Sequence, residues 1–376
     1  MDKMFMYHSV IPENNKASYG EYDNIDMMMT FEGRSLNLNS VRIEGVLSVT
    51  QNGTSLSSTA NEAKDIKLDK LVASHSVIES IQTSFQNGGL IENLNEYPRL
   101  VKALTSATEG VDAMNNASNV CQLKAPTDEM TNLLLKGVGV ETQLTTPIST
   151  DPDFSFKPKF CLNSAIGDHL PYSKSGAIRV SINLARTFAV LFGLDVDSTT
   201  AYSISDLRLT FTSVPEMPQH MDGTIVMNTI LNLKQSIQSS FANIQTKVPA
   251  ICRAVTISFL QQSAENQAKE NNLQLMKVEG LNEVQYLFND STNSLISYIL
   301  RDYEEVISRA IDSVYDSGKN NATMNNLADN QGFLAGLDFG GMVDLRNQKF
   351  GFQLDSAITS SDPFIAFLYF HSQVVV

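Results

Sequence analysis

Hydrophobic and polar residues alternate with a period of two in several parts of the chain, a pattern typical of strands that bury one face. This alternation predicts strands at Val41–Val49, Ile178–Leu184, Leu207–Thr212, Val255–Phe259 and Val284–Phe288. The last segment, Pro363–Val376, is apolar on both faces. We therefore expect it to form a central strand that is covered on both sides, by the chain itself or by a neighbouring subunit.

Helical periodicity is much rarer. The clearest case is Ile299–Val314, where apolar residues fall on one face and charged residues largely on the other. A second, short helix is predicted at Leu94–Thr105, with Pro98 in its first turn, where the missing N–H does no harm. Asn115–Lys136 is a third candidate. Many strands and few helices predict an all-β protein built of antiparallel sandwiches.

Two prolines after a predicted strand, in Val214–Pro218, indicate a stiff connection between two domains. We expect an N-terminal arm at residues 1–23, a first domain at 24–217 and a second at 218–376. Each half contains enough strands for one eight-stranded sandwich. No sequence repeat relates the halves.

The composition argues against several partners. The chain has 376 residues and a net charge of −14, and it contains no run of three basic residues. Direct binding to nucleic acid needs clustered Lys and Arg, so we do not expect it, and an anionic membrane surface is disfavoured for the same reason. Only 18% of the residues are charged, which suits a protein that buries much of its surface against neighbours.

No catalytic or metal-binding pattern is present in the sequence, so we expect no enzyme activity and no cofactor. The three cysteines are far apart and contain no CxxC pair, and we interpret them as free, mostly buried thiols. The five histidines, His8, His75, His169, His220 and His371, show no metal-ligand spacing. Asp65 and Asp69, beside Lys67 and Lys70, are read as a solvated charged turn, and Gly336–Gly341 as a turn between two strands.

The order of these segments resembles the double jelly-roll major capsid proteins of tailless icosahedral double-stranded DNA viruses, including tectivirus-like and marine phages, virophages and polinton-like viruses. The segments that carry the resemblance are Leu38–Val49, His75–Ile81 with Gly89–Tyr97, Phe154–Lys157, Ile178–Ile182, Tyr202–Leu209, Lys247–Phe259 and the helix before Phe333–Phe339. They are loose patterns of strand and turn that cover most of Asn24–Val376.

The resemblance implies two antiparallel eight-stranded jelly-roll barrels, side by side, with a few short helices in the connections. It also implies a structural protein of the virion, made in the host cytoplasm. Three copies would form a pseudo-hexagonal homotrimer that tiles an icosahedral capsid around the genome, with minor capsid or vertex proteins and an internal membrane as further partners. In this setting the N-terminal arm would become ordered on assembly, anchored by Phe5, Tyr7, Tyr19 and Tyr22.

Two other functions remain open at the level of sequence. A receptor- or glycan-binding sandwich, such as a spike or lectin-like protein, would expose an aromatic cluster in one set of loops. The 11 tyrosines allow a sugar platform, whereas the absence of tryptophan argues against one. A polysaccharide-active enzyme would need two carboxylates about 5–10 Å apart in a groove, and no pattern in the sequence points to such a pair.

Overall fold

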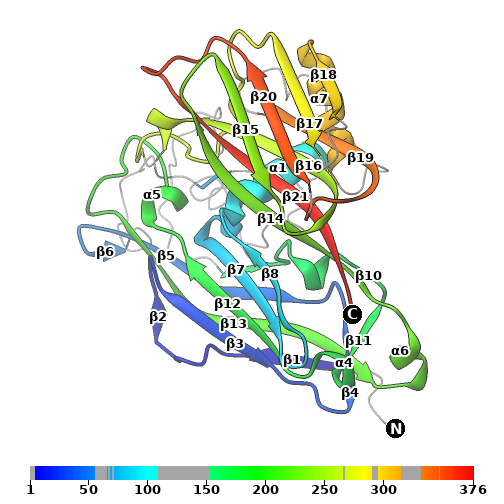
Figure 1. Cartoon of the computed structure of the whole chain (residues 1–376). Helices are drawn as coiled ribbons and strands as arrows, with labels where there is room; N and C mark the ends of the chain where they lie inside the picture. Colours follow the sequence, from blue (N-terminus) through cyan, green and yellow to red (C-terminus); the bar gives the residue numbers. More distant parts are fainter. Residues whose placement is uncertain are drawn as a thin grey trace.

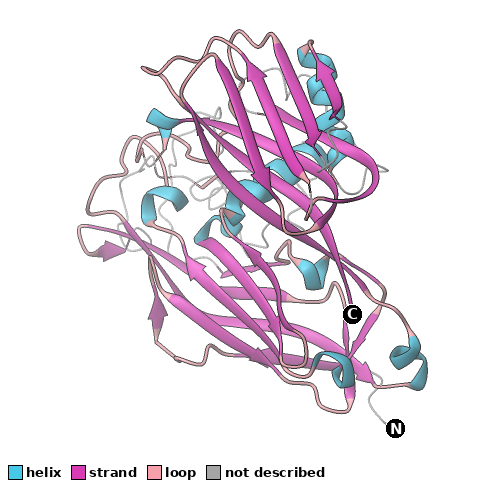
Figure 2. Ribbon diagram, viewed as in Figure 1, coloured by secondary structure: helices cyan, strands magenta, loops and turns pink. Residues whose placement is uncertain are grey.

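Strands dominate the computed structural model of the chain, which describes residues 5–55, 66, 68–69, 72–108, 153–265, 267–289, 295–314, 332–346 and 348–376 (Figures 1 and 2). The strands form four antiparallel sheets, arranged as two sandwiches. Figure 1 shows one sandwich above the other, with the C-terminal strand running between them. The all-β, two-sandwich architecture agrees with the expectation from the sequence.

The first sandwich consists of sheets 1 and 2. Sheet 1 contains β1 (Met6–Val10), β2 (Ser18–Tyr19), β4 (Arg34–Asn37), β5 (Arg42–Gln51), β6 (Thr54–Ser55), β9 (Asp153–Phe156), β11 (His169–Pro171) and β13 (Ala201–Pro215). Sheet 2 contains β3 (Asn24–Met29), β7 (Ile78–Phe85), β8 (Gly89–Leu94) and β12 (Ile178–Leu184).

The second sandwich consists of sheets 3 and 4. Sheet 3 contains β10 (Ala165–Ile166), β14 (Val226–Ile237), β16 (Ile251–Gln261), β19 (Leu334–Asp344) and β21 (Phe364–Val375). Sheet 4 contains β15 (Phe241–Lys247), β17 (Glu283–Asn289), β18 (Leu295–Leu300) and β20 (Lys349–Asp355). The short β10 comes from the first half of the chain and pairs with β14, so it ties the two sandwiches together.

Short helices lie in the connections. They are α1 (Tyr97–Thr108), α4 (Tyr172–Ser175), α5 (Thr187–Val190), α6 (Pro218–Asp222) and α7 (Tyr303–Ser313), with the 3₁₀ turns η1 (Ala73–Val77), η2 (Cys161–Asn163) and η3 (Gln262–Ala264). The chain passes from the first sandwich to the second through α6, between the end of β13 and the start of β14.

The predicted alternation is visible in the burial of the strands. Along β5 and β12 every second side chain is buried, because neighbouring residues of a strand point to opposite faces of the sheet. Asn52 and Gly53 join β5 to β6 in a two-residue hairpin, and both have positive φ angles of 53° and 73°. An Asn-Gly pair is the preferred sequence for this turn, since both residues tolerate the left-handed region.

The two halves of the chain share one strand order. Eight strands of the first half, β1, β3, β5, β7, β8, β9, β12 and β13, correspond in sequence order to the eight strands β14–β21 of the second. In each half the first, eighth, third and sixth strands form one sheet, and the second, seventh, fourth and fifth form the other. A helix follows the fifth strand in both halves: α1 after β8 and α7 after β18. The halves are therefore structural duplicates.

This correspondence changes the interpretation of the N-terminus. Residues 1–23 were predicted to form an arm that is ordered on assembly, but β1 pairs with β13 from Met6↔Ser213 to Val10↔Leu209, and β2 also pairs with β13. Within a single chain, β1 takes the position that β14 takes in the second half. The alternation did not reveal it because β1 has only five residues and all of them keep some solvent exposure.

The C-terminal strand β21 divides the two hydrophobic cores. Its buried side chains alternate: Ile365, Phe367 and Tyr369 belong to the core of the first half, whereas Phe364, Ala366, Leu368 and Phe370 belong to the core of the second. Both faces of the strand are thus covered by the chain itself, which explains why Phe364–Phe370 is apolar on both faces.

Two local predictions differ from the structure. The helix predicted at Ile299–Val314 begins at Tyr303, because Leu295–Leu300 forms β18, and the glycine-rich segment Gly336–Gly341 lies inside the continuous strand β19 rather than in a turn. Pairing between β16 and β19 shifts register at this point, and Gly340 has a φ of 74°. The helix predicted at Asn115–Lys136 lies outside the described residues.

Candidate functional site

The described parts of the chain contain no cluster of three or more His, Cys, Asp or Glu side chains that could hold a metal ion. No described helix is long and apolar enough to cross a membrane. Cys161 and Cys252 are free and buried, and burial raises the pKa of both thiols. Cys121 lies outside the described residues.

Two histidines that are distant in sequence meet in the structure. The rings of His169 and His220 lie 4.5 Å apart, and His220 Nδ1 is 3.0 Å from Ser35 Oγ. Burial, and next the charge of His220, lower the pKa of His169. No local pattern indicates this pair, because its members are 51 positions apart, on β11 and α6. The pair has no third ligand of the metal-binding type among the described residues.

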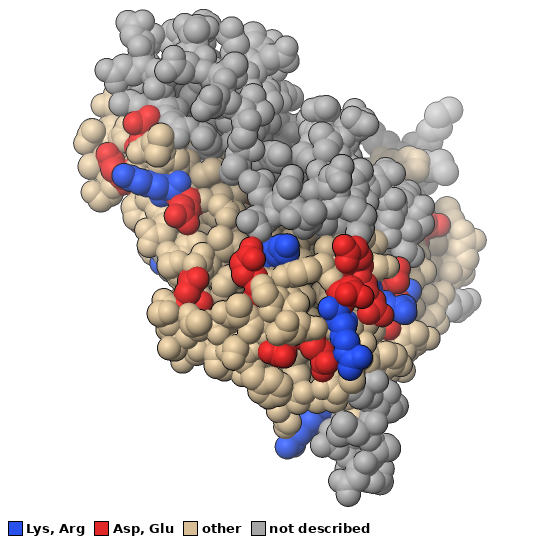
Figure 3. Space-filling view, turned by 90° about the horizontal axis from the view of Figure 1, so that it is seen from above, with Lys and Arg blue, Asp and Glu red and all other residues tan. Residues whose placement is uncertain are grey.

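Charged residues of both signs lie close together on the face shown in Figure 3. Close ion pairs of this kind include Lys234 with Glu265 at 2.5 Å and with Glu96 at 3.1 Å. A nucleic-acid-binding face would instead show Lys and Arg gathered without acidic neighbours.

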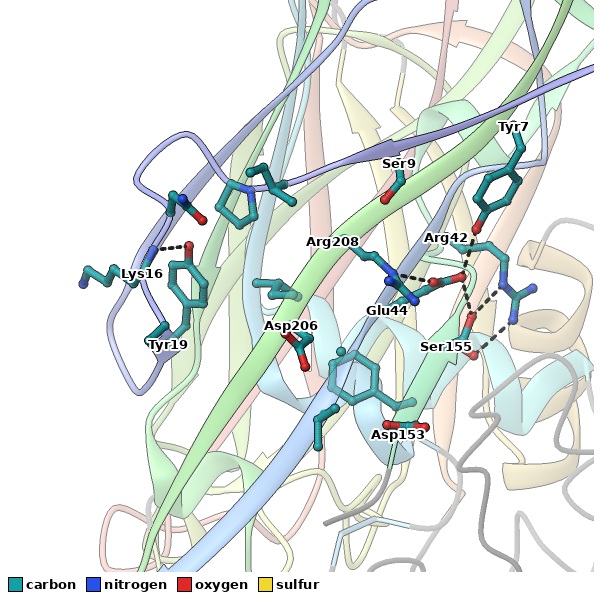
Figure 4. A pocket seen from close by; sticks show the side chains of 18 residues that line it. Tyr7, Ser9, Lys16, Tyr19, Arg42, Glu44, Asp153, Ser155, Asp206 and Arg208 are labelled. Atoms are coloured by element: carbon teal, nitrogen blue, oxygen red, sulfur yellow. Dashed lines mark hydrogen bonds and ion pairs between the residues drawn. The ribbon is translucent and has the colours of Figure 1, made fainter. Parts of the chain in front are cut away.

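A groove of about 780 Å³ lies on the outer face of sheet 1. Residues from β1, β5, β9 and β13, together with the segment that joins β1 to β2, line it. Figure 4 shows Tyr7 and Ser9 from β1 on one side, with Glu44, Arg42 and Ser155 below them. We call this surface the sheet 1 groove.

Glu44 is the centre of the polar contacts in the sheet 1 groove. It accepts hydrogen bonds from Arg208 Nε at 2.9 Å, Thr210 Oγ1 at 3.2 Å, Ser155 Oγ at 3.4 Å and Tyr7 Oη at 3.5 Å. Arg42 Nε donates to Ser155 Oγ at 2.8 Å. Four strands are linked through these side chains. The groove is held in shape by its own polar network, and this suits a docking surface better than a reaction centre.

The four aromatic residues predicted as assembly anchors do not share one environment. Phe5, Tyr7 and Tyr22 are exposed to 61%, 63% and 71%. Tyr19 is only 2% exposed, and its hydroxyl accepts a hydrogen bond from Lys16 N and donates one to Asn14. Tyr19, on β2, is therefore part of the first core. An anchoring role of the other three stays a prediction.

The interface between the two halves is buried and rich in polar contacts. Arg99 of α1 lies over the ring of Phe367 at 4.2 Å and donates to the carbonyl oxygens of Asn272 and Gln274. A guanidinium over an aromatic face is attracted by the ring's quadrupole, more strongly when both are shielded from water. Arg99 is 3% exposed, so this contact fixes α1 of the first half on β21 of the second.

A buried ion pair lies beside this contact. Lys102 Nζ is 2.7 Å from Asp69 Oδ2, which also accepts a hydrogen bond from Asn271 Nδ2 at 2.6 Å. Asp69 is 2% exposed, so the prediction that Asp69 belongs to a solvated turn is wrong. Asp65, Lys67 and Lys70 lie outside the described residues. The sequence could not reveal the pair because Lys102 is 33 positions away.

Glu92 of β8 bridges the two halves. Its carboxylate oxygens accept hydrogen bonds from Cys161 N at 2.7 Å and from Ile230 N, on β14, at 3.1 Å. Burial raises the pKa of this carboxyl to about 7, although both N–H groups favour the charged form. A carboxyl that titrates near neutral pH thus lies between the sandwiches.

Comparisons with solved structures show that other proteins share this fold. The sequence matches no protein-family model and no curated protein. Among solved structures, the chain is similar to VP54 of PBCV-1 fitted into a reconstruction of the virophage Sputnik. Here the TM-score is 0.61 at 10% identity over 99% of this chain and 94% of that chain. The fold is a double jelly roll.

Other structures with this double jelly roll come from distant viruses. The Faustovirus major capsid protein matches with a TM-score of 0.59 at 9% identity, covering 99% of this chain and 90% of that chain. The STIV major capsid protein matches with a TM-score of 0.53 at 10% identity, covering 98% and 96%. At such low identity the likeness concerns the fold, and the expected fold is confirmed.

Proposed function

We propose that this protein is a viral major capsid protein whose homotrimers tile an icosahedral shell around the genome. The observation that carries the proposal is the structural duplication: each chain has two sandwiches in which eight corresponding strands follow the same order. The likeness to capsid proteins over almost the whole chain supports it.

The duplication has a direct geometric consequence for assembly. Three chains in a closed head-to-tail ring present six similar sandwiches, and six similar edges fill a hexagonal lattice. A heterologous contact that closes into a ring satisfies every interface of its members. The protein would then act through its surface alone, located in the virion after synthesis in the host cytoplasm. Minor capsid proteins at the vertices and an internal membrane would be further partners.

The exposed aromatics of the N-terminus fit this role. Phe5, Tyr7 and Tyr22 present large apolar surface with few rotatable bonds, which is the chemistry of anchors in protein interfaces. We propose that they contact neighbouring copies or capsomers. Tyr19 is excluded from such a contact by its burial.

The native mass tests the proposal. One chain has a mass of 41.4 kDa, so a trimer has a mass of about 124 kDa. Light scattering on the purified protein should give this mass at moderate salt, and regular larger particles should appear at high protein concentration. A species that stays at 41.4 kDa at all concentrations would refute the capsomer and would favour a glycan- or receptor-binding role.

A further inference from the structure

An amine, a carboxylate and a side-chain amide meet in the buried interface between the two halves of the chain. Lys102 Nζ lies 2.7 Å from Asp69 Oδ2, and Asn271 Nδ2 donates a hydrogen bond to the same oxygen at 2.6 Å. Lys102 belongs to α1 of the first half, whereas Asn271 lies in the segment between η3 and β17 of the second. Because both nitrogen atoms contact one oxygen, the amine and the amide are direct neighbours.

All three side chains are shielded from water. Asp69 is 2% exposed, and Lys102 and Asn271 are each 5% exposed. A buried charge pair loses the hydration of both ions, and only excellent geometry makes up for that loss. A reaction that turned these groups into neutral ones would therefore be favoured in this interior. The same burial keeps out water, which would compete with the amine for the amide carbon.

The amide of Asn271 is held in an orientation that suits attack on its carbon. Asn271 Oδ1 accepts a hydrogen bond from Leu273 N at 2.9 Å. A backbone N–H at this oxygen stabilises the negative charge that develops there when a nucleophile adds to the carbonyl carbon. Asp69 is fixed as well, since its Oδ1 accepts a hydrogen bond from Val72 N at 3.2 Å. The site thus combines a nucleophile, a proton carrier, an electrophilic carbon and a donor for the oxyanion.

We propose that Lys102 and Asn271 join in an isopeptide bond that the chain forms by itself, with Asp69 as the proton carrier. A proton passes from Lys102 Nζ to Asp69 Oδ2, and the neutral amine then attacks Asn271 Cγ. Asp69 gives this proton to Asn271 Nδ2, the Cγ–Nδ2 bond breaks, and ammonia leaves. A second proton moves from Nζ to Asp69. The products are one amide, one ammonia and a neutral Asp69, so the reaction needs no metal, oxidant or other reactant.

The bond would tie the two sandwiches together covalently. Holding the amine and the amide in one site makes their reaction intramolecular, which removes the entropic cost of bringing them together. The product links α1 of the first half to the second half across the interface that Arg99 and Glu92 also bridge. This inference is independent of the capsid function proposed above. A permanent ion pair between Lys102 and Asp69 is the alternative, and the mass of the protein distinguishes the two.

Mass spectrometry of the purified, denatured wild type tests the proposal. The mass should lie below the sequence mass by one ammonia, about 17 Da. Trypsin should fail to cleave after Lys102 and should release one branched peptide, in which residues 100–124 are joined to residues 270–277. Loss of ammonia at an asparagine that precedes glycine, such as Asn52, gives the same mass but no branched peptide. A wild type without the branched peptide would overturn the proposal.

Two lysine variants complete the test. Lys102→Arg keeps a positive charge beside Asp69, but its guanidinium stays charged and cannot attack the amide, so the loss of ammonia should disappear. Lys16→Arg is the matched control, because Lys16 Nζ also pairs with an aspartate, Asp23 at 2.6 Å, but on the surface. This variant should lose ammonia and yield the branched peptide as the wild type does. An undiminished loss of ammonia in Lys102→Arg would contradict the assignment of Lys102 as the nucleophile.

Discussion

Ionisation of Glu92 should lower the stability of the protein as the pH rises from about 4.5 to 7. Burial raises the folded-state pKa of this carboxyl from 4.5 to about 7, so the folded protein holds the proton more tightly than the unfolded chain. Its contribution to stability is fully present below pH 4.5 and is lost as the pH rises through 7. With 1.36 kcal/mol for each pH unit between the two pKa values, the loss is about 3 kcal/mol.

A variant is needed to isolate this effect, because another buried group titrates in the opposite sense. Burial lowers the pKa of His371 to about 4, and this makes the protein more stable as the pH rises toward 6.5. The two contributions partly cancel in the wild type. In Glu92→Gln the side chain is neutral at every pH, so the Glu92 contribution alone disappears while His371 is unchanged.

The measurement is urea unfolding of the wild type and Glu92→Gln at about pH 4.5 and 7.5, at one protein concentration, since self-association also adds to apparent stability. In Glu92→Gln the NH₂ group of the amide faces one of the two N–H donors, Cys161 N or Ile230 N, and cannot accept its hydrogen bond. Because one buried donor then lacks its acceptor, the variant should be less stable than the wild type at low pH. Between the two pH values the difference should shrink by about 3 kcal/mol. A difference that stays constant would show that Glu92 is ionised in the folded protein throughout, and would refute the argument.

Two further predictions concern the second sandwich. His371 Nε2 lies 2.8 Å from Thr256 Oγ1 and is buried as the neutral ring, so stability should be lost as the pH falls from 6.5 to 4, and urea unfolding of His371→Gln should lack this loss. A Cβ added at Gly336 would lie 2.5 Å from Ser313 Oγ and 2.8 Å from Val255 O, so Gly336→Ala should cost about 1–3 kcal/mol of unfolding free energy. Gly341→Ala is the control, because nothing lies within 4 Å of its added Cβ, and equal unfolding midpoints for the two variants would contradict the packing argument.

The long strands of the fold could be predicted from the sequence because burial of one face leaves a periodic signal. β5, β12 and β16 appear where the alternation predicted them. Short or partly exposed strands leave no such signal, and β1 was missed for this reason. The start of α7 was misplaced because Ile299 continues an apolar helical face in sequence while it belongs to β18 in space.

The polar contacts of the candidate surfaces were beyond sequence reasoning. Glu44 and Arg208 are 164 positions apart, and they meet only because β5 pairs with β13. Lys102 and Asp69 likewise meet through tertiary packing, and their burial reverses the interpretation of Asp69 as solvated. The first contact depends on the pairing of β5 with β13 and the second on the packing of α1, and neither leaves a local pattern in the sequence.

The duplicated fold places two outer sheet faces of different composition in corresponding positions. The outer face of sheet 3 carries Ile365, Phe367 and Tyr369, and it is covered as soon as the chain folds, so it can be as apolar as a core. The corresponding face of sheet 1 presents the ion pair of Arg208 and Glu44 instead. Surfaces that join separately folded copies keep a largely polar composition, because they stay in water until the copies meet. The polar outer face of sheet 1 therefore has a composition that the proposed self-assembly could use.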